Sequence, residues 1–350
     1  MSEDIVKEEP KKVKKEDATI SVGLDCGTMH LVCSRSDSDE VKVTRNVFLP
    51  VDKDDISITK LSEISYVKSD DDDMFIIGSD AFEFANLFGQ PVSRPMERGL
   101  ISPKEIAAID VLTLMIKDLI GDTKNKEVYC SYSIPAEAID EGRSVTYHEN
   151  VFARILNSLG VNHVSVNEAM AIIYSECAAE KFSGIGVSFG AGMANIAISY
   201  KGIEAHTFST ARAGDWIDKQ VAEALAMIPN RVTNLKEKYM KLSGEVSIKN
   251  KKTKRVLEAL YYYHKALIEY TVKKIIDEFD EKVDIEVDEE IPIVVSGGTS
   301  LPEGFVDLFR NVISNYDLPF EVSEIRSAKN PLTAVSNGLL VRTIADVKGK

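Results

Sequence analysis

Two short glycine-containing turns in this sequence have the residue types needed to hold a phosphate group. The first, Asp25-Cys26-Gly27-Thr28, lies between two β-type runs in residues 19–34. Successive backbone N–H groups of such a turn can point into one concavity, which suits an anion. Gly27 lets the backbone approach closely, Thr28 adds a hydroxyl, and Asp25 could hold Mg²⁺ through water. An ordinary hairpin turn has a similar composition, so this motif alone does not identify a site.

The second turn repeats this design about 160 residues later. Residues 186–200 (GVSFGAGMANIAISY) again give a strand, a glycine-containing turn and a strand, with Gly190 and Gly192 in the turn. The repetition indicates a duplicated domain. Two such turns, one from each domain, could hold a phosphate chain from both sides.

A third glycine motif follows an apolar run at residues 291–295. It reads Ser296-Gly297-Gly298-Thr299-Ser300. Paired glycines at the end of a strand let the main chain lie flat against a nucleoside. Each loop alone has an ordinary structural explanation, but three of them in this order, each after a strand, indicate a nucleotide site.

The segments between these motifs predict an α/β protein with two domains. Strand patterns cover residues 41–49, 64–67, 128–135 and 163–166, and helical patterns cover residues 106–120, 144–159, 215–279 and 331–344. A chain of 350 residues exceeds what one hydrophobic core usually serves. Residues 1–18 are charged and have almost nothing to bury, so we expect a disordered tail.

Composition excludes several classes of protein. The net charge of -14 argues against direct binding to nucleic acid, which is held by clusters of Lys and Arg. No apolar run of about 18 residues is present, so no transmembrane segment is expected. The four cysteines lack metal-ligand spacing and are expected to be reduced, buried thiols of a cytoplasmic protein: Cys26, Cys33, Cys130 and Cys177.

The order of the motifs resembles the superfamily of actins, sugar kinases and 70-kDa heat-shock chaperone ATPases. GLDCGTMHLV resembles its phosphate-1 motif, GVSFGAGMANIAI its phosphate-2 motif and VVSGGTSLPEGF its adenosine motif. SIPAEAIDEGR with VNEAMAIIYSE resembles connect-1, and NPLTAVSNGLL resembles connect-2. The resemblance covers residues 19–345. The stretch IIGSDAFEFANLFGQPVSRPMERGLI is most similar to bacterial magnetosome and cell-shape actins.

The resemblance implies an actin-like ATPase fold, in which two duplicated RNase H-like domains flank a nucleotide cleft. Domain I would cover residues 19–180, with a smaller inserted subdomain at about 49–95, and would include a C-terminal helix in 326–350. Domain II would cover residues 181–325, with a smaller helical subdomain at about 214–254.

The resemblance also implies that the cleft binds ATP or ADP with Mg²⁺, although the residues leave GTP open as well. Asp25 would hold the metal. Lys236 falls beside the expected adenine position, where a solvated helical lysine is an equal alternative, and Glu168 would open the helix beneath the site as a helix-start or hinge residue. The implied nucleotide-binding residues are Asp25, Cys26, Gly27, Thr28, Met29, Ser188, Gly190, Ala191, Gly192, Met193, Gly214, Asp215, Lys236, Gly297, Gly298, Thr299 and Ser300.

Two positions depart from the family pattern. The phosphate-2 motif normally begins with a metal-coordinating Asp, and here that position is Ser188, so metal binding would depend on Asp25 alone. The residue that positions the attacking water is expected in the connect-1 helix at His148, with Glu149 beside it. An imidazole or a carboxylate there could orient water for phosphoryl transfer. An exposed helical position is the alternative interpretation of His148.

Three functions are compatible with this fold. The first is an ATP-binding protein that assembles head to tail into cytoskeletal filaments, with slow Mg²⁺-dependent hydrolysis and an adaptor or cargo that the sequence does not identify. The second is a non-polymerising ATP-dependent binding module, such as a chaperone-like or adaptor ATPase. The third, a small-molecule kinase, is disfavoured because the first domain lacks an Asp-bearing substrate motif that could act as a base.

Overall fold

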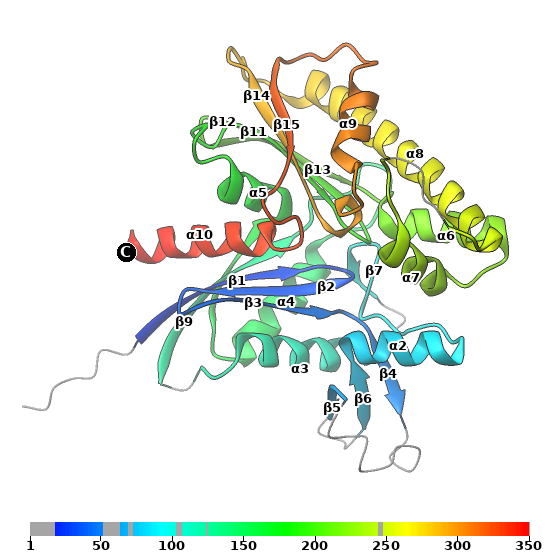
Figure 1. Ribbon diagram of the computed structural model, residues 1–350. Coiled ribbons are helices and arrows are strands. Elements are labelled where there is room, and N and C mark those ends of the chain that lie inside the picture. Colours follow the sequence, from blue (N-terminus) through cyan, green and yellow to red (C-terminus); the bar gives the residue numbers. More distant parts are fainter. Residues whose placement is uncertain are drawn as a thin grey trace, which may run out of the picture.

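The computed structural model describes residues 18–51, 64–68, 73–102, 107–123, 125–243 and 248–349. The predicted tail therefore lies outside the described residues, except for residue 18. Two five-stranded mixed sheets form the framework, each with helices packed against it (Figure 1). The two sheets lie on opposite sides of the region where their hairpins meet.

The first sheet has the strand order β10-β9-β1-β2-β3. Strands β1, β2 and β3 are antiparallel neighbours, and β9 and β10 run parallel to β1. Helices α3 (Ala108–Ile120) and α4 (Thr146–Ser158) contribute to the same hydrophobic core as this sheet. The strands are β1 (Ala18–Cys26), β2 (His30–Arg35), β3 (Ser38–Arg45), β9 (Lys126–Ile134) and β10 (Asn162–Asn167).

The second sheet repeats this topology in the order β13-β12-β11-β14-β15. Here β11, β12 and β13 are antiparallel neighbours, and β14 and β15 run parallel to β11. The matching order and directions confirm the predicted duplication. The strands are β11 (Gly184–Phe189), β12 (Ala194–Tyr200), β13 (Ile203–Thr210), β14 (Ile291–Ser296) and β15 (Val322–Ser327).

Helices of the second half follow the predicted helical region but divide it into three. Pro229 begins the second of them, as its fixed φ favours. Asn250 caps the third, because its side chain accepts hydrogen bonds from the N–H groups of Lys252 and Thr253. These helices are α6 (Gly214–Leu225), α7 (Pro229–Tyr239) and α8 (Lys251–Lys282), and α9 (Phe305–Ile313) joins them on the same core.

A smaller part is inserted between β3 and α3. It contains a three-stranded sheet in the order β4-β6-β5, one helix and a short two-stranded ribbon. Its elements are β4 (Phe48–Val51), β5 (Tyr66–Lys68), β6 (Met74–Ile77), α2 (Gly78–Phe88), β7 (Met96–Glu97) and β8 (Leu100–Ile101).

Helices α5 (Glu168–Glu176) and α10 (Ala334–Lys348) join the two halves. They pack so closely that a Cβ atom at Gly338 would lie 1.7 Å from the carbonyl oxygen of Ala171. The Thr343 hydroxyl of α10 also donates to the carbonyl oxygen of Val22 in β1, at 2.9 Å. The C-terminal helix therefore packs on the first sheet, as the predicted domain division requires. The domain boundaries themselves stay a prediction.

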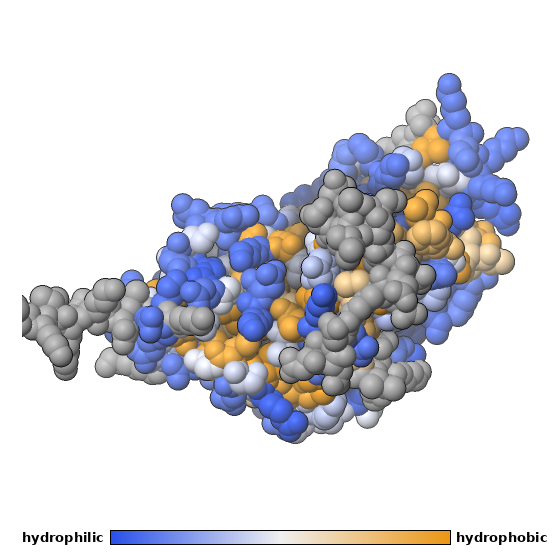
Figure 2. Space-filling model, turned by 90° about the horizontal axis from the view of Figure 1, so that it is seen from below, coloured by the Kyte–Doolittle hydropathy of each residue, from blue (hydrophilic) through white to orange (hydrophobic). Residues whose placement is uncertain are grey.

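The surface seen from below is mostly hydrophilic, with hydrophobic side chains in separate patches (Figure 2). Such a mixture is normal for a folded domain in water. In the part of the chain that the structure describes, no helix is both long and apolar enough to cross a membrane.

Candidate functional site

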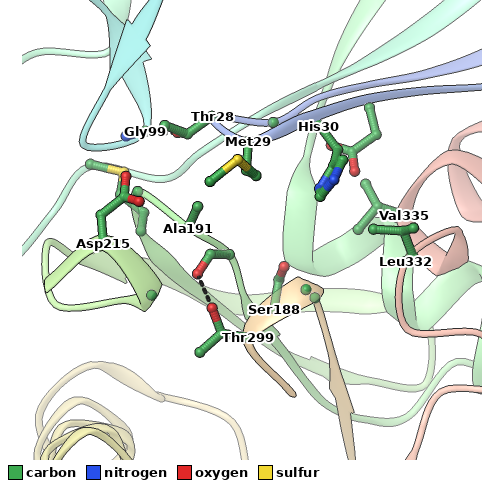
Figure 3. Close-up of a pocket in the computed structure, with 18 of the residues that line it drawn as sticks. Thr28, Met29, His30, Gly99, Ser188, Ala191, Asp215, Thr299, Leu332 and Val335 are labelled. Carbon is green, nitrogen blue, oxygen red and sulfur yellow. Dashed lines mark hydrogen bonds between the residues drawn. The ribbon is translucent and has the colours of Figure 1, made fainter. Parts of the chain in front are cut away.

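A cavity of about 260 Å³ lies where the two sheets approach each other. The turn between β1 and β2 forms one side of it, and the turn between β11 and β12 forms the opposite side. Figure 3 shows Thr28, Met29 and His30 facing Ser188 and Ala191 across this space. The two predicted phosphate turns therefore share one cavity.

The two turns have equivalent geometry. In the first, Cys26 pairs with Leu31, and in the second Phe189 pairs with Ala194, so each turn spans the same number of residues. A Cβ atom at Gly27 would lie 2.6 Å from the carbonyl oxygen of His30. At Gly190 the corresponding distance, to the carbonyl oxygen of Met193, is 2.8 Å. Any side chain at either glycine would force the turn to change shape.

The turns also contact each other through Gly99, in the tight turn between β7 and β8. The Gly99 N–H donates to the Thr28 hydroxyl oxygen at 3.1 Å. A Cβ atom at Gly192 would lie 2.2 Å from the Gly99 nitrogen and 2.4 Å from the Thr28 Oγ1. Glycine at both positions is what allows the two halves to meet beside the cavity.

Two buried carboxyl groups line the cavity, one from each side of the first half's sheet edge. Asp25 is the residue paired with Val32 at the end of β1, and its Oδ1 accepts a hydrogen bond from the Ser133 hydroxyl at 2.9 Å. Glu168 begins α5. It accepts from the Ser188 hydroxyl at 2.6 Å and from the Asn195 side-chain amide at 2.9 Å.

Burial changes the acidity of both carboxyl groups. Desolvation raises the pKa of Asp25 to about 7, against a smaller opposing effect of the Ser133 hydrogen bond. Desolvation, together with the nearby charge of Asp25, raises the pKa of Glu168 to about 8. A cation bound between them would favour the ionised forms. Carboxylate and hydroxyl oxygens are the donors that Mg²⁺ prefers, so this donor set fits the implied metal.

The far end of the cavity carries a lysine–aspartate pair. The Lys236 Nζ lies 2.7 Å from the Asp218 Oδ1, and the Thr233 hydroxyl donates to the Asp218 Oδ2 at 2.6 Å. Burial raises the pKa of Asp218, and the charge of Lys236 opposes this rise. Lys236 is therefore held in place at the cavity wall and is not a solvated helical lysine.

The glycine motif after β14 closes one side of the cavity. The Thr299 hydroxyl donates to the Gly190 carbonyl oxygen at 2.7 Å, which ties this motif to the second turn (Figure 3). Gly297 adopts a φ of 92°, a region that favours glycine. At Gly298 an added Cβ would meet no atom within 4 Å, so open space lies beside this residue.

Every predicted nucleotide-binding residue except Ser300 lines this cavity. The Ser300 hydroxyl instead donates to the Gly297 carbonyl oxygen at 2.7 Å and so stabilises the short 3-10 turn Gly298–Ser300.

The structure does not bring His148 and Glu149 to the cavity, which corrects their predicted position. His148 is 1% exposed and stacks on Phe152, with ring centroids 4.8 Å apart, and burial lowers its pKa to about 3. Glu149 accepts a hydrogen bond from the Ser165 hydroxyl at 2.6 Å. The physical reason is that His148 lies on the face of α4 that packs into the protein core.

The sequence analysis gave Glu168 another role and overlooked Asp218 and Glu237, which also line the cavity. A signal for Glu168 was available. It directly follows β10, which runs parallel to β1, so it must lie at the same sheet edge as Asp25. Asp218 lies one helical turn after Asp215, at a spacing that places both on one face of α6.

Two sheets of the same topology around a shared cavity define an actin-like ATPase fold, close to that of the bacterial actins. Solved structures agree. A MamK double helical filament has a TM-score of 0.70 at 19% identity and covers 94% of this chain and 99% of its own. MreB5 of Spiroplasma citri bound to ADP has a TM-score of 0.65 at 15% identity and covers 95% and 98%. The ethanolamine utilization protein EutJ from Carboxydothermus hydrogenoformans has a TM-score of 0.53 at 17% identity and covers 92% and 90%.

A family model described as Volactin matches residues 20–343. The chain therefore belongs to the Volactin family. A search of curated proteins gives no match.

Proposed function

We propose that this protein binds ATP with Mg²⁺ in the cavity, assembles into head-to-tail filaments and hydrolyses the nucleotide slowly. The observation that carries the proposal is the pair of equivalent glycine turns facing each other across one cavity that also contains two buried carboxyl groups. Backbone N–H groups of such turns bind phosphate oxygens, and carboxylates hold the accompanying cation.

Each turn has a defined role in this proposal. The first, including Gly27, Thr28 and Met29, and the second, residues 190–193, hold the phosphates from opposite sides. Gly297, Gly298 and Thr299 lie against the nucleoside, and Lys236 lies at its base. Gly214 and Asp215 support the second turn, since their N–H groups donate to the carbonyl oxygens of Gly190 and Ala191 at 3.1 and 2.8 Å.

Asp25 and Glu168 together would hold the metal and the attacking water. Glu168 supplies the negative charge that Ser188 lacks, because the Ser188 hydroxyl donates to it directly. Mg²⁺, when bound, would neutralise charge on the phosphates. Its presence would also keep both carboxyls ionised, so that Glu168 could accept a proton from water or orient it. We therefore assign water positioning to Glu168 instead of His148 or Glu149.

Assembly is supported by the neighbours at the level of fold. The MamK neighbour is described as a double helical filament, and further neighbours are MamK bound to AMPPNP and MreB5 bound to ADP. We propose the same kind of self-association here, in the cytoplasm, with an adaptor or cargo as a further partner. The four free, buried cysteines fit a reducing compartment: Cys26, Cys33, Cys130 and Cys177.

Calorimetric titration with ATP and Mg²⁺ tests the cavity. Asp25→Ala removes a carboxyl that holds the metal, and Gly298→Val places a side chain in open space inside the site. Since the valine would meet no protein atom close to its Cβ, this variant should fold normally and still lose ATP binding. Wild-type affinity in both variants would remove the cavity from the proposal.

Sedimentation with ATP and Mg²⁺, followed by negative-stain microscopy, tests assembly. Filaments that appear only with nucleotide would support the proposal. Tight ATP binding without any sedimenting polymer would instead favour the non-polymerising binding module.

A further inference from the structure

The two ends of α8 carry opposite charge. At its start, residues 248–257 contain five exposed bases and no acid, and we call these bases the basic end: Lys249, Lys251, Lys252, Lys254 and Arg255. At its other end, residues 277–290 contain eight exposed acids and only one base, Lys282. We call these acids the acidic end: Asp277, Asp280, Glu281, Asp284, Glu286, Asp288, Glu289 and Glu290.

This arrangement opposes the helix macrodipole. The start of a helix carries partial positive charge and its end partial negative charge, so acids at the start and bases at the end are favourable. The first turn of α8 has no acid, and Lys282 is the only base in the last turn. The charges of α8 therefore do not serve the stability of the helix.

Neighbours within the protein satisfy few of these charges. In the described ranges, no ion pair involves any residue of the basic end. At the acidic end, Asp277 lies 3.0 Å from the Lys274 ammonium, and Lys201 lies 3.5 Å from Asp288 and 3.7 Å from Glu289. The other five acids have no ion pair among the described residues.

The segment after α8 presents its acids outward in a regular pattern. Val283, Ile285 and Val287 are partly buried against the core of the second half, and the residues between them, Asp284 and Glu286, are exposed. The apolar contacts thus hold an extended acidic strip at the surface.

The two ends are far apart and lie at opposite corners of the second half. A helix of 32 residues is about 48 Å long. In Figure 1, α8 runs along the outer side of the molecule from the corner beside α6 and α7 to the corner where β14 begins. One copy therefore cannot pair its own two ends, whereas two copies in line can.

We propose that the basic end of α8 docks on the acidic end of α8 in the next copy of this chain, and so forms a head-to-tail contact of the filament. The inference rests on the proposed assembly. A contact between two different patches leaves one free patch of each kind on every dimer, so the assembly can extend without closing. A nucleic acid or an anionic membrane would match only the basic end, whereas a second copy matches both.

Charge reversal with mixing tests this contact. The basic-end variant is K251E/K252E/K254E, and the acidic-end variant is D284K/E286K/E290K. Each variant alone has like charges at both ends, so its assembly with ATP and Mg²⁺ should need at least tenfold more protein than wild type. An equimolar mixture should assemble again, because each reversed end meets its reversed counterpart. The variant with all six substitutions should also assemble.

Two controls separate the contact from folding and from net charge. K117E/K329E/K348E changes the net charge as much as the basic-end variant but at exposed lysines elsewhere, and it should assemble like wild type. The reversed variants should melt no lower than wild type, because their charges then agree with the macrodipole and the Asn250 cap is unchanged.

Four outcomes would overturn the inference. One is unchanged assembly of both reversed variants, and another is a loss that mixing does not restore. A third is co-sedimentation of wild type with phosphatidylserine vesicles that the basic-end variant loses, without rescue of assembly on mixing, since this would assign the basic end to a membrane. Wild type that binds ATP and forms no polymer would overturn the assembly proposal itself, and with it this contact.

Discussion

At the scale of single residues, the chemistry of the cavity depends on Asp25 and Glu168. Both carboxyls are buried, and burial raises their pKa values toward neutrality when no cation lies between them. His148, in contrast, is a neutral core residue whose two ring nitrogens have no hydrogen-bond partner in the described part of the chain. The residues thus divide into two that can act on a ligand and one that supports packing.

Substitution of Glu168 and His148 should separate these roles. Glu168→Gln keeps the shape and removes the base, so phosphate release should slow by roughly 100-fold or more. His148→Ala leaves a void beside Phe152 and should cost on the order of 2–4 kcal/mol of unfolding free energy without slowing phosphate release. The measurements are a phosphate-release assay and urea unfolding. Slower release in His148→Ala than in Glu168→Gln would contradict the assignment.

The stability of the nucleotide-free protein should depend on the same two carboxyls. Their folded-state pKa values lie above the ordinary values, so the folded protein binds more protons than the unfolded chain in this range. The stabilisation from protonation is present at low pH and is lost as pH rises, over about pH 5 to 8.

Urea unfolding across this range, with Mg²⁺ chelated, measures the effect. Wild type should lose stability as pH rises, and Asp25→Asn with Glu168→Gln should lose clearly less. The exposed acid Glu289, changed to Gln, serves as the control and should follow wild type. Parallel curves for wild type and the Asp25/Glu168 double variant would contradict the account.

At the scale of elements, the sequence predicted the two hairpins and β14 well, because tight glycine turns between apolar runs are local signals. It did not predict β15 as a strand. This edge strand has few buried residues, so its pattern is weak. His148 was misplaced because distance from Gly160 along the chain does not tell which face of α4 turns to the core. Glu168 could have been placed from the parallel pairing of β9 and β10.

The crossing of α5 and α10 gives an element-scale prediction. A methyl group at Gly338 would lie 1.7 Å from the Ala171 carbonyl oxygen, so Gly338→Ala must separate the two helices. Overpacking of this kind costs about 1–3 kcal/mol of unfolding free energy, occasionally more. Gly142→Ala is the matched control, because its Cβ would meet no atom within 4 Å. Equal urea midpoints for the two variants would show that the helices do not depend on this close contact.

At the scale of the whole molecule, ion pairs hold the two halves together at the mouth of the cavity. Arg94 pairs with Asp215 at 2.7 Å, and Arg45 pairs with Glu237. The Asn230 side-chain amide also donates to the Gln90 carbonyl oxygen at 3.0 Å. These partners are more than 100 residues apart in the sequence. No local pattern pairs them, so this part of the site could be known only from the folded structure.

The central claim is that the two equivalent turns hold one nucleotide between them, and calorimetric titration with ATP and Mg²⁺ tests it most directly. Gly27→Ala and Gly190→Ala each place a Cβ against a backbone carbonyl and reshape one turn. Each should weaken ATP binding by roughly tenfold or more, about 1.4 kcal/mol, although the turns belong to different halves of the protein. Gly142→Ala should bind as wild type does. Wild-type affinity in either turn variant, or no binding by the wild type, would contradict the claim.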